Sequence, residues 1–116
     1  MSLVWHVRLT NQAELDLLDI TMWTAENFGP RQPEHYVETV GMAIEALHDG
    51  PTILGAQSRD DIRPGIRTLH VARHGRKGRH FIVFMESHGQ NIDVLRLLHD
   101  SMELARHAHA AMDQTH

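Results

Sequence analysis

Cysteine is absent from this chain of 116 residues. Neither a disulfide framework nor a zinc–thiolate site can therefore form. No apolar run reaches the ~18 residues that a transmembrane helix needs, and the first residues lack the basic-then-apolar order of a signal peptide. We expect a soluble, cytoplasmic protein that folds as a single domain over residues 1–116.

The chain also lacks the motifs of common catalytic and metal sites. Eleven histidines occur, but none lies in a His-Glu-x-x-His pattern, and His107 and His109 would point to different faces of a helix. No serine lies in a Gly-x-Ser-x-Gly elbow. The stretch at residues 75–78, Gly-Arg-Lys-Gly, lacks the Ser or Thr that follows the lysine of a phosphate-binding loop. We expect no metal ion and no cofactor.

Charge is distributed unevenly along the chain. Residues 1–58 carry two arginines and eight carboxylates, a net charge of −6, and residues 80–116 carry two arginines and five carboxylates, a net charge of −3. Residues 59–79 carry seven basic side chains and two aspartates, a net charge of +5. This basic segment can attract an anionic partner, either a nucleic acid or an acidic protein face, whereas the overall charge of −4 argues against general coating of DNA.

The N-terminal half has the pattern of one strand and two helices. Residues 3–9 alternate between apolar and polar side chains, as a strand does, and Thr10 or Asn11 can cap the helix that follows. Over residues 12–27 a wide apolar surface recurs at helical spacing, with a central stripe of Leu15, Leu18, Met22 and Ala25 flanked by Leu17, Ile20 and Trp23. We expect this helix to contact two surfaces. A second helix begins near Pro33 and ends before residues 50–51, Gly-Pro, which completes an αα-hairpin.

The C-terminal half changes to the pattern of strands. After a loop over residues 52–65, apolar runs at residues 66–71, 79–85 and 91–98 predict three strands joined by short turns, hence an antiparallel meander. Asp100 and Glu103 then form a capping-box pattern, which predicts a short C-terminal helix. The predicted fold class is α+β: an N-terminal strand, an αα-hairpin, a three-stranded antiparallel meander joined by the N-terminal strand, and a short C-terminal helix.

The last predicted strand and the turn after it carry the most specific pattern. Residues 94–107 read Val-Leu-Arg-Leu-Leu-His-Asp-Ser-Met-Glu-Leu-Ala-Arg-His, which resembles the closing segment of ParE-type toxins of bacterial toxin–antitoxin systems. Weaker matches are Pro51 with Gly55, and Gly65 with Arg67 and Leu69. The element order also resembles that of ParE and RelE toxins, so the resemblance spans about residues 3–109 and implies a RelE/ParE-like fold.

The resemblance implies one of two activities. ParE-like toxins inhibit DNA gyrase without cutting RNA and are neutralised by a ParD-like antitoxin, whereas RelE-like toxins are endoribonucleases that cut mRNA on the ribosome. Here Asp100 and Ser101 stand where RelE relatives bring in an arginine, and the only tyrosine, Tyr36, lies in the other half of the chain. We therefore favour a non-enzymatic gyrase inhibitor of a type II system. The alternatives are a RelE-like endoribonuclease and an inactive partner-binding relative.

Specific residues follow from these hypotheses. The residues expected to bind the target are Arg67, Arg73, Arg76, Lys77, Arg79, Arg96 and His99. Under the endoribonuclease alternative, the catalytic residues would be Arg67, Arg79, Arg96, His99 and His107.

Structural roles compete with these assignments. Arg67 and Arg96 can instead pair with Asp93, Glu86 or a backbone carbonyl, and His99 can hydrogen-bond the turn that follows it. The antitoxin is expected to bind an apolar surface formed by Met22, Trp23 and Phe28. Because the helical half is acidic, we expect the antitoxin segment to be amphipathic and flanked by basic residues.

Overall fold

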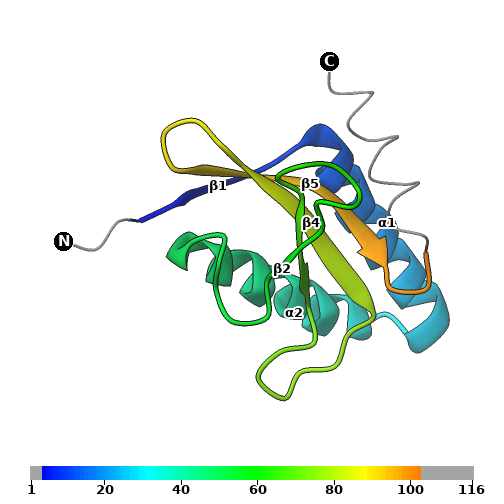
Figure 1. Ribbon diagram of the computed structural model, residues 1–116. Helices are drawn as coiled ribbons and strands as arrows, with labels where there is room; N and C mark the ends of the chain where they lie inside the picture. Colours follow the sequence, from blue (N-terminus) through cyan, green and yellow to red (C-terminus); the bar gives the residue numbers. More distant parts are fainter. Residues whose placement is uncertain (1–3, 103–116) are drawn as a thin grey trace.

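The computed structural model describes residues 4–102, in which two helices pack on one face of a five-stranded sheet (Figure 1). The elements in order are β1 (His6–Leu9), α1 (Asn11–Phe28), α2 (Gln32–Ala46), the 3-10 turn η1 (Leu47–Asp49), β2 (Gln57–Ser58), β3 (Arg67–His70), β4 (His80–Ser87) and β5 (Asn91–His99). This arrangement confirms the predicted α+β fold class. Within residues 4–102, no helix is both long enough and apolar enough to cross a membrane.

The strands lie in the order β1-β5-β4-β3-β2. β3, β4 and β5 form the predicted antiparallel meander, and β1 joins it by running parallel to β5, with Leu9 opposite Val94. The loop predicted over residues 52–65 was wrong in one respect, because it contains β2, which pairs antiparallel with β3. β2 consists of two exposed polar residues, so it has no alternation of apolar and polar side chains from which a strand could be predicted. The predicted C-terminal helix lies beyond Met102, outside the described residues.

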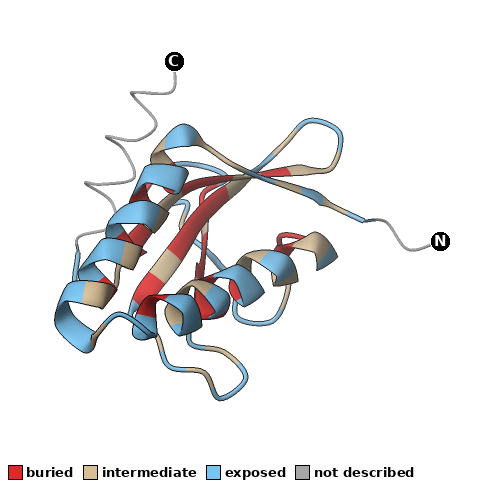
Figure 2. Cartoon of the chain, turned by 180° about the vertical axis from the view of Figure 1, so that it is seen from behind, coloured by how far each residue is buried: buried red, intermediate tan, exposed pale blue. Residues whose placement is uncertain are grey.

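α1 turns toward the sheet a different face from the one that its central apolar stripe suggested. The residues of α1 that are buried are Ala13, Asp16, Ile20 and Thr24. Leu15, Leu18 and Met22 are instead 54%, 55% and 55% exposed. Exposed residues cover the side of the helices that faces away from the sheet (Figure 2). The expectation that this helix contacts two surfaces is confirmed, since α1 packs on both α2 and β5. The apolar stripe does not mark the packed face, because that face contains two polar residues, which hydrogen bonds make compatible with burial. The outer face, in contrast, has the stronger apolar pattern.

Two clusters of buried apolar side chains lie on opposite faces of the sheet. The larger cluster lies under the helices and contains Ala13, Ile20, Val40, Ala43, Leu47, Leu69, Val71, Ile82, Phe84, Ile92, Val94 and Leu97. The smaller cluster joins the sheet to the loop after β2 and contains Ile62, Ile66, Val83, Leu95 and Leu98. β5 contributes to both, and its register against β4 shifts between Val83 and Phe84, which is a local bulge.

The loop between β3 and β4 approaches α2 closely at Gly78. A Cβ atom on this residue would overlap the side chain of Val71 and would lie 3.3 Å from the Tyr36 hydroxyl oxygen. Glycine is therefore required by space at this position, not by an unusual backbone angle. The close contact holds the basic loop over residues 72–79 against the helical hairpin, where it forms one wall of a groove.

Candidate functional site

A groove of about 1100 Å³ lies between the helical hairpin and the loop that joins β3 to β4. The helices contribute Trp23, Thr24, Phe28, Gln32, His35 and Tyr36 to its lining. The loop and the start of β4 contribute Ala72, Gly75, Arg76, Lys77, Gly78, Arg79 and His80. We call this feature the basic groove, because its lining includes three cationic side chains and no carboxylate.

Two aromatic rings stand at the helical side of the basic groove. Trp23 is 47% exposed and Phe28 is 63% exposed, and their ring centroids lie 5.5 Å apart in an edge-to-face arrangement. α1 ends directly after Phe28, at Gly29, whose φ of 99° is readily adopted only by glycine. Large aromatic side chains that remain this exposed are typical of partner-binding surfaces.

The cations on the opposite side of the basic groove differ in how they are held. Arg76 donates to the Thr39 hydroxyl oxygen at 2.9 Å and to the carbonyl oxygen of His35 at 3.2 Å, and it lies 3.8 Å from the carboxylate of Glu38. Arg79 forms an ion pair with Asp100, at 2.9 Å. Lys77 is exposed and makes no hydrogen bond or ion pair with the part of the chain that the structure describes. Lys77 is therefore the cation that is free to meet a ligand.

A polar cluster closes the inner end of the basic groove where β4 begins. The backbone N–H of Arg79 donates to the Tyr36 hydroxyl oxygen at 2.9 Å, and that hydroxyl lies 2.6 Å from Nδ1 of His80. The hydroxyl and Nδ1 share one hydrogen bond, whose direction depends on the tautomer of His80. The His80 ring also contacts the His99 ring edge to face, with centroids 5.2 Å apart.

The burial of His80 determines its charge. Only 6% of this residue is exposed, and burial lowers its pKa from 6.5 to about 4, with a smaller contribution from the neighbouring His99. Burial also raises the pKa of Tyr36. Both side chains are thus neutral near pH 7, so this pair brings no charge to the groove.

Asp100 is the acceptor that joins the ends of three strands. It pairs with Arg79, accepts from Nε2 of His70 at 3.1 Å, and lies 3.7 Å from Nδ1 of His99. The hydrogen bonds from Arg79 and then His70 lower the pKa of Asp100 to about 2. His99 also accepts from the backbone N–H of Ser101 at 3.1 Å, which confirms the predicted hydrogen bond to the turn.

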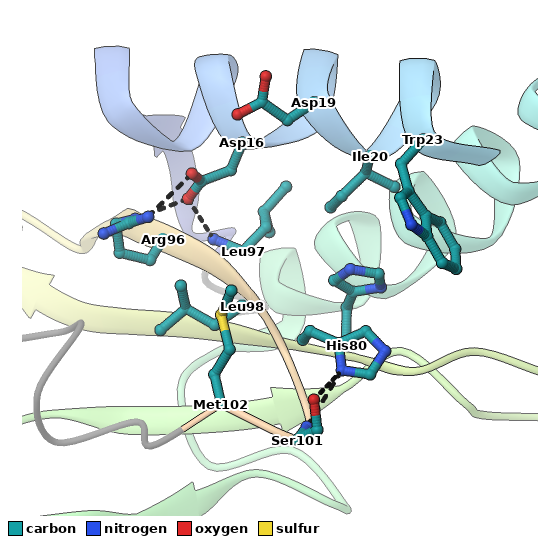
Figure 3. Close-up of a pocket in the computed structure, with 11 residues that line it drawn as sticks. Asp16, Asp19, Ile20, Trp23, His80, Arg96, Leu97, Leu98, Ser101 and Met102 are labelled. Carbon is teal, nitrogen blue, oxygen red and sulfur yellow. Dashed lines mark hydrogen bonds and ion pairs between the residues drawn. The ribbon is translucent and has the colours of Figure 1, made fainter. Parts of the chain in front are cut away.

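Arg96 is held by a carboxylate from α1 and not by either predicted acid. It donates to Asp16 at 2.7 Å and 3.1 Å, and the backbone N–H of Leu97 donates to the same carboxylate at 2.9 Å (Figure 3). β1 covers the edge of β5 only as far as Val94, so Asp16 replaces a strand neighbour for Leu97. The ion pair borders a separate pocket of about 450 Å³ next to Trp23 and His80.

The residues predicted to bind the target do not form one continuous surface. Arg67 donates to the carbonyl oxygen of Pro51 at 2.7 Å, which is the structural alternative predicted for it, and Arg73 donates to that of Leu54 at 3.3 Å. The residues that lie together at the basic groove or beside it are Arg76, Lys77, Arg79 and His99. Of the proposed catalytic set, Arg79 and His99 meet at Asp100, Arg67 and Arg96 have other partners, and His107 lies outside the described residues.

Comparisons with known proteins identify the family. A family model described as "ParE toxin of type II toxin-antitoxin system, parDE" matches residues 7–104. The chain belongs to the ParE toxin family. It is 31% identical over 98 residues to Toxin ParE1 of Mycobacterium tuberculosis (strain CDC 1551 / Oshkosh), an alignment that covers 84% of this chain and 92% of that protein. It is also 27% identical over 100 residues to Toxin ParE1 of Caulobacter vibrioides (strain ATCC 19089 / CIP 103742 / CB 15). That alignment covers 86% of this chain and 94% of the relative.

A solved structure supports the same fold. The chain superposes with a TM-score of 0.66 on a structure titled "Chromosomal ParDE TA system from P. aeruginosa", at 21% sequence identity. The superposition covers 84% of this chain and 98% of that one. The match confirms the ParE-like architecture predicted from the closing segment and the element order. Membership of the family also makes the chain a toxin of a type II toxin–antitoxin system.

Sequence reasoning missed three residues of this ParE-family site. Asp16 was hidden because it lies on a helix, 80 positions before the arginine that it binds. Tyr36 was noted only as lying in the other half of the chain, yet α2 places its hydroxyl 2.6 Å from Nδ1 of His80. His80 was one of many histidines, and nothing local distinguishes it. Among the described residues, no group of three or more His, Cys, Asp or Glu side chains is arranged to hold a metal ion.

Proposed function

We propose that this ParE-family toxin inhibits DNA gyrase in the cytoplasm, by binding and without catalysis, and that a ParD-like antitoxin neutralises it. Family membership supports the target, because the relatives matched over most of their length are named ParE1 and the solved structure is titled as a ParDE system. Antitoxin binding is assigned to Met22, Trp23 and Phe28. These side chains are 55%, 47% and 63% exposed, which supports a surface that a partner covers.

One observation favours binding over RNA cleavage: the arginines of the proposed catalytic set each have a different partner. Arg67 binds a carbonyl oxygen, Arg79 binds Asp100, and Arg96 binds Asp16. Cleavage of a phosphodiester requires cations that converge on the position where negative charge develops. Here Asp100 neutralises the one arginine that lies near His99, and its carboxylate would repel a phosphate.

The target surface is assigned to the basic face that includes Arg73, Arg76, Lys77 and Arg79, with His99 beside it. Their charges favour an acidic surface on the target and speed the encounter with it. Arg67 and Arg96 contribute to this surface by holding the strands that carry it.

The proposal is tested with purified gyrase and with intact cells. We expect the chain to inhibit supercoiling of relaxed plasmid, and we expect its expression to arrest growth with filamentation and a DNA-damage response. Equimolar antitoxin should reverse both effects. Rapid loss of intact mRNA without gyrase inhibition would establish the endoribonuclease alternative instead. Normal growth with folded protein present would establish an inactive partner-binding relative.

A further inference from the structure

We infer that the basic groove binds an apolar segment of the antitoxin that carries acidic side chains, and that the segment's carboxylates meet Lys77. The inference rests on the proposed function, since it specifies which part of an antitoxin enters this groove. It reverses the charge expected from the sequence, where the acidic helical half suggested a basic-flanked segment. The observations that carry it are the charge of the groove lining and the exposure of its aromatic residues.

The apolar character of the segment follows from the helical wall. Trp23 and Phe28 present their rings to the groove while roughly half of each residue is in contact with water. Covering large aromatic side chains is the main source of affinity at protein interfaces. A volume of about 1100 Å³ also exceeds the ~300–1,000 Å³ that is usual for a small-molecule pocket. The groove therefore fits a length of polypeptide better than a metabolite.

The acidic character of the segment follows from the opposite wall. Arg76, Lys77 and Arg79 line the groove without any carboxylate among the lining residues, in a chain whose net charge is −4. The outer face of α1 has the reverse charge, since Glu14, Asp19 and Glu26 are exposed beside its apolar stripe. A basic segment would suit that outer face but would be repelled in the groove. Charge complementarity thus gives the two surfaces different partner sequences.

A nucleic acid is the other anionic ligand that an aromatic and basic groove could attract. Binding of a phosphate backbone depends on several cations that are available to neutralise successive phosphates. Arg76 is already bonded to Thr39 and to the backbone of His35 and lies 3.8 Å from the Glu38 carboxylate, and Arg79 is neutralised by Asp100. Of the three cations that line the groove, Lys77 alone makes no hydrogen bond or ion pair with the described residues, which suits one or two carboxylates and not a polyanion.

Lys77 is the only lysine of the chain, which allows a direct test. The complex with the protein encoded beside this toxin is treated with a carbodiimide, which joins an amine to a carboxylate only when the two are in contact. We expect peptide mapping to find a cross-link between Lys77 and an Asp or Glu within an apolar segment of the antitoxin. The α-amino group is the internal control, because it reacts with the same reagents.

Three variants complete the test. Lys77→Glu should weaken antitoxin binding about tenfold, because an attraction becomes a repulsion, whereas Lys77→Arg should keep the affinity and lose the cross-link. Arg63→Glu, an equal charge change on the loop at the other face of the sheet, should leave the affinity within twofold. Circular dichroism checks that each variant is folded.

The outcomes separate the inference from the proposed function. A tight complex with no cross-link at Lys77 and with unchanged affinity for Lys77→Glu would overturn the inference and leave the toxin–antitoxin assignment intact. Displacement of the antitoxin by a short oligothymidylate, but not by a leucine- and glutamate-rich peptide, would overturn it in favour of a nucleic-acid groove. Failure of the neighbouring protein to bind at all would overturn the proposed function, and the inference with it.

Discussion

Removing the carboxylate of Asp16 should destabilise the fold more than removing any exposed acid. In Asp16→Ala, Arg96 would keep a charge in a site where its side chain is only 16% exposed, and the N–H of Leu97 would lose its acceptor. Breaking a buried ion pair by deleting one partner typically costs about 3–5 kcal/mol, and an orphaned buried donor adds about 1–3 kcal/mol. Because the second cost partly overlaps the first, we expect a loss of about 4 kcal/mol.

Urea denaturation followed by circular dichroism measures this loss. For a domain of this size, about 4 kcal/mol corresponds to a fall in Tm of about 15–30 °C. The matched control is Asp93→Ala, which removes the partner of Arg8 in a pair whose side chains are 26% and 59% exposed. That change should cost at most about 1 kcal/mol. Equal losses for the two variants would refute the view that Asp16 supports the edge of β5.

Three further predictions concern the groove and its surroundings. Gly78→Ala should lower the free energy of unfolding by about 1–3 kcal/mol, because the new Cβ would overlap Val71. Gly41→Ala in α2 has open space around it and should raise the free energy of unfolding by about 0.5–1 kcal/mol. Equal effects of the two variants would contradict the packing argument. The pKa of His80 is lowered from 6.5 to about 4 in the folded protein. As the pH falls, His80 is therefore protonated in the unfolded chain before it is protonated in the folded one, so the stability of the fold decreases between pH 6.5 and pH 4. The stability profile between these values should be flatter in His80→Gln, and an unchanged profile would contradict the assignment. Lys77→Glu should keep the melting temperature and weaken gyrase inhibition about tenfold in a supercoiling assay, so full inhibition would remove Lys77 from the target surface.

Local patterns were sufficient to predict most of the elements. The cap on α1 is Thr10, whose side chain accepts from the N–H of Ala13, and Pro33 lies in the first turn of α2, both as predicted. Short turns between alternating apolar runs likewise predicted β3, β4 and β5. These features depend on neighbours a few positions apart, so their physical causes are visible in the sequence itself.

The parts that could not be predicted depend on contacts between distant positions. Arg96 was recognised as unusual within a strand, but its partner Asp16 became evident only when α1 was placed against β5. The packed face of α1 could not be read from its apolar stripe for a related reason, because Thr24 satisfies its hydroxyl by donating to the carbonyl oxygen of Ile20 at 2.7 Å. Hydrophobic periodicity depends only on residue types, so it does not show that a polar side chain such as Thr24 has a hydrogen-bond partner within its own helix. The basic groove itself could not be predicted, because a loop from the second half of the chain forms one of its walls.

The parallel pairing of β1 with β5 has a consequence for how a nascent chain acquires its fold. β5 lies between β1 and β4, so the first strand has no neighbour in the sheet until residues 91–94 have been synthesised. Until then the ribosome carries a helical hairpin whose apolar face is covered by an incomplete sheet. Such long-range closure slows folding. β5, the last strand of the described residues, therefore acts as a completion step, and a chain truncated before it cannot close the sheet that supports the basic groove.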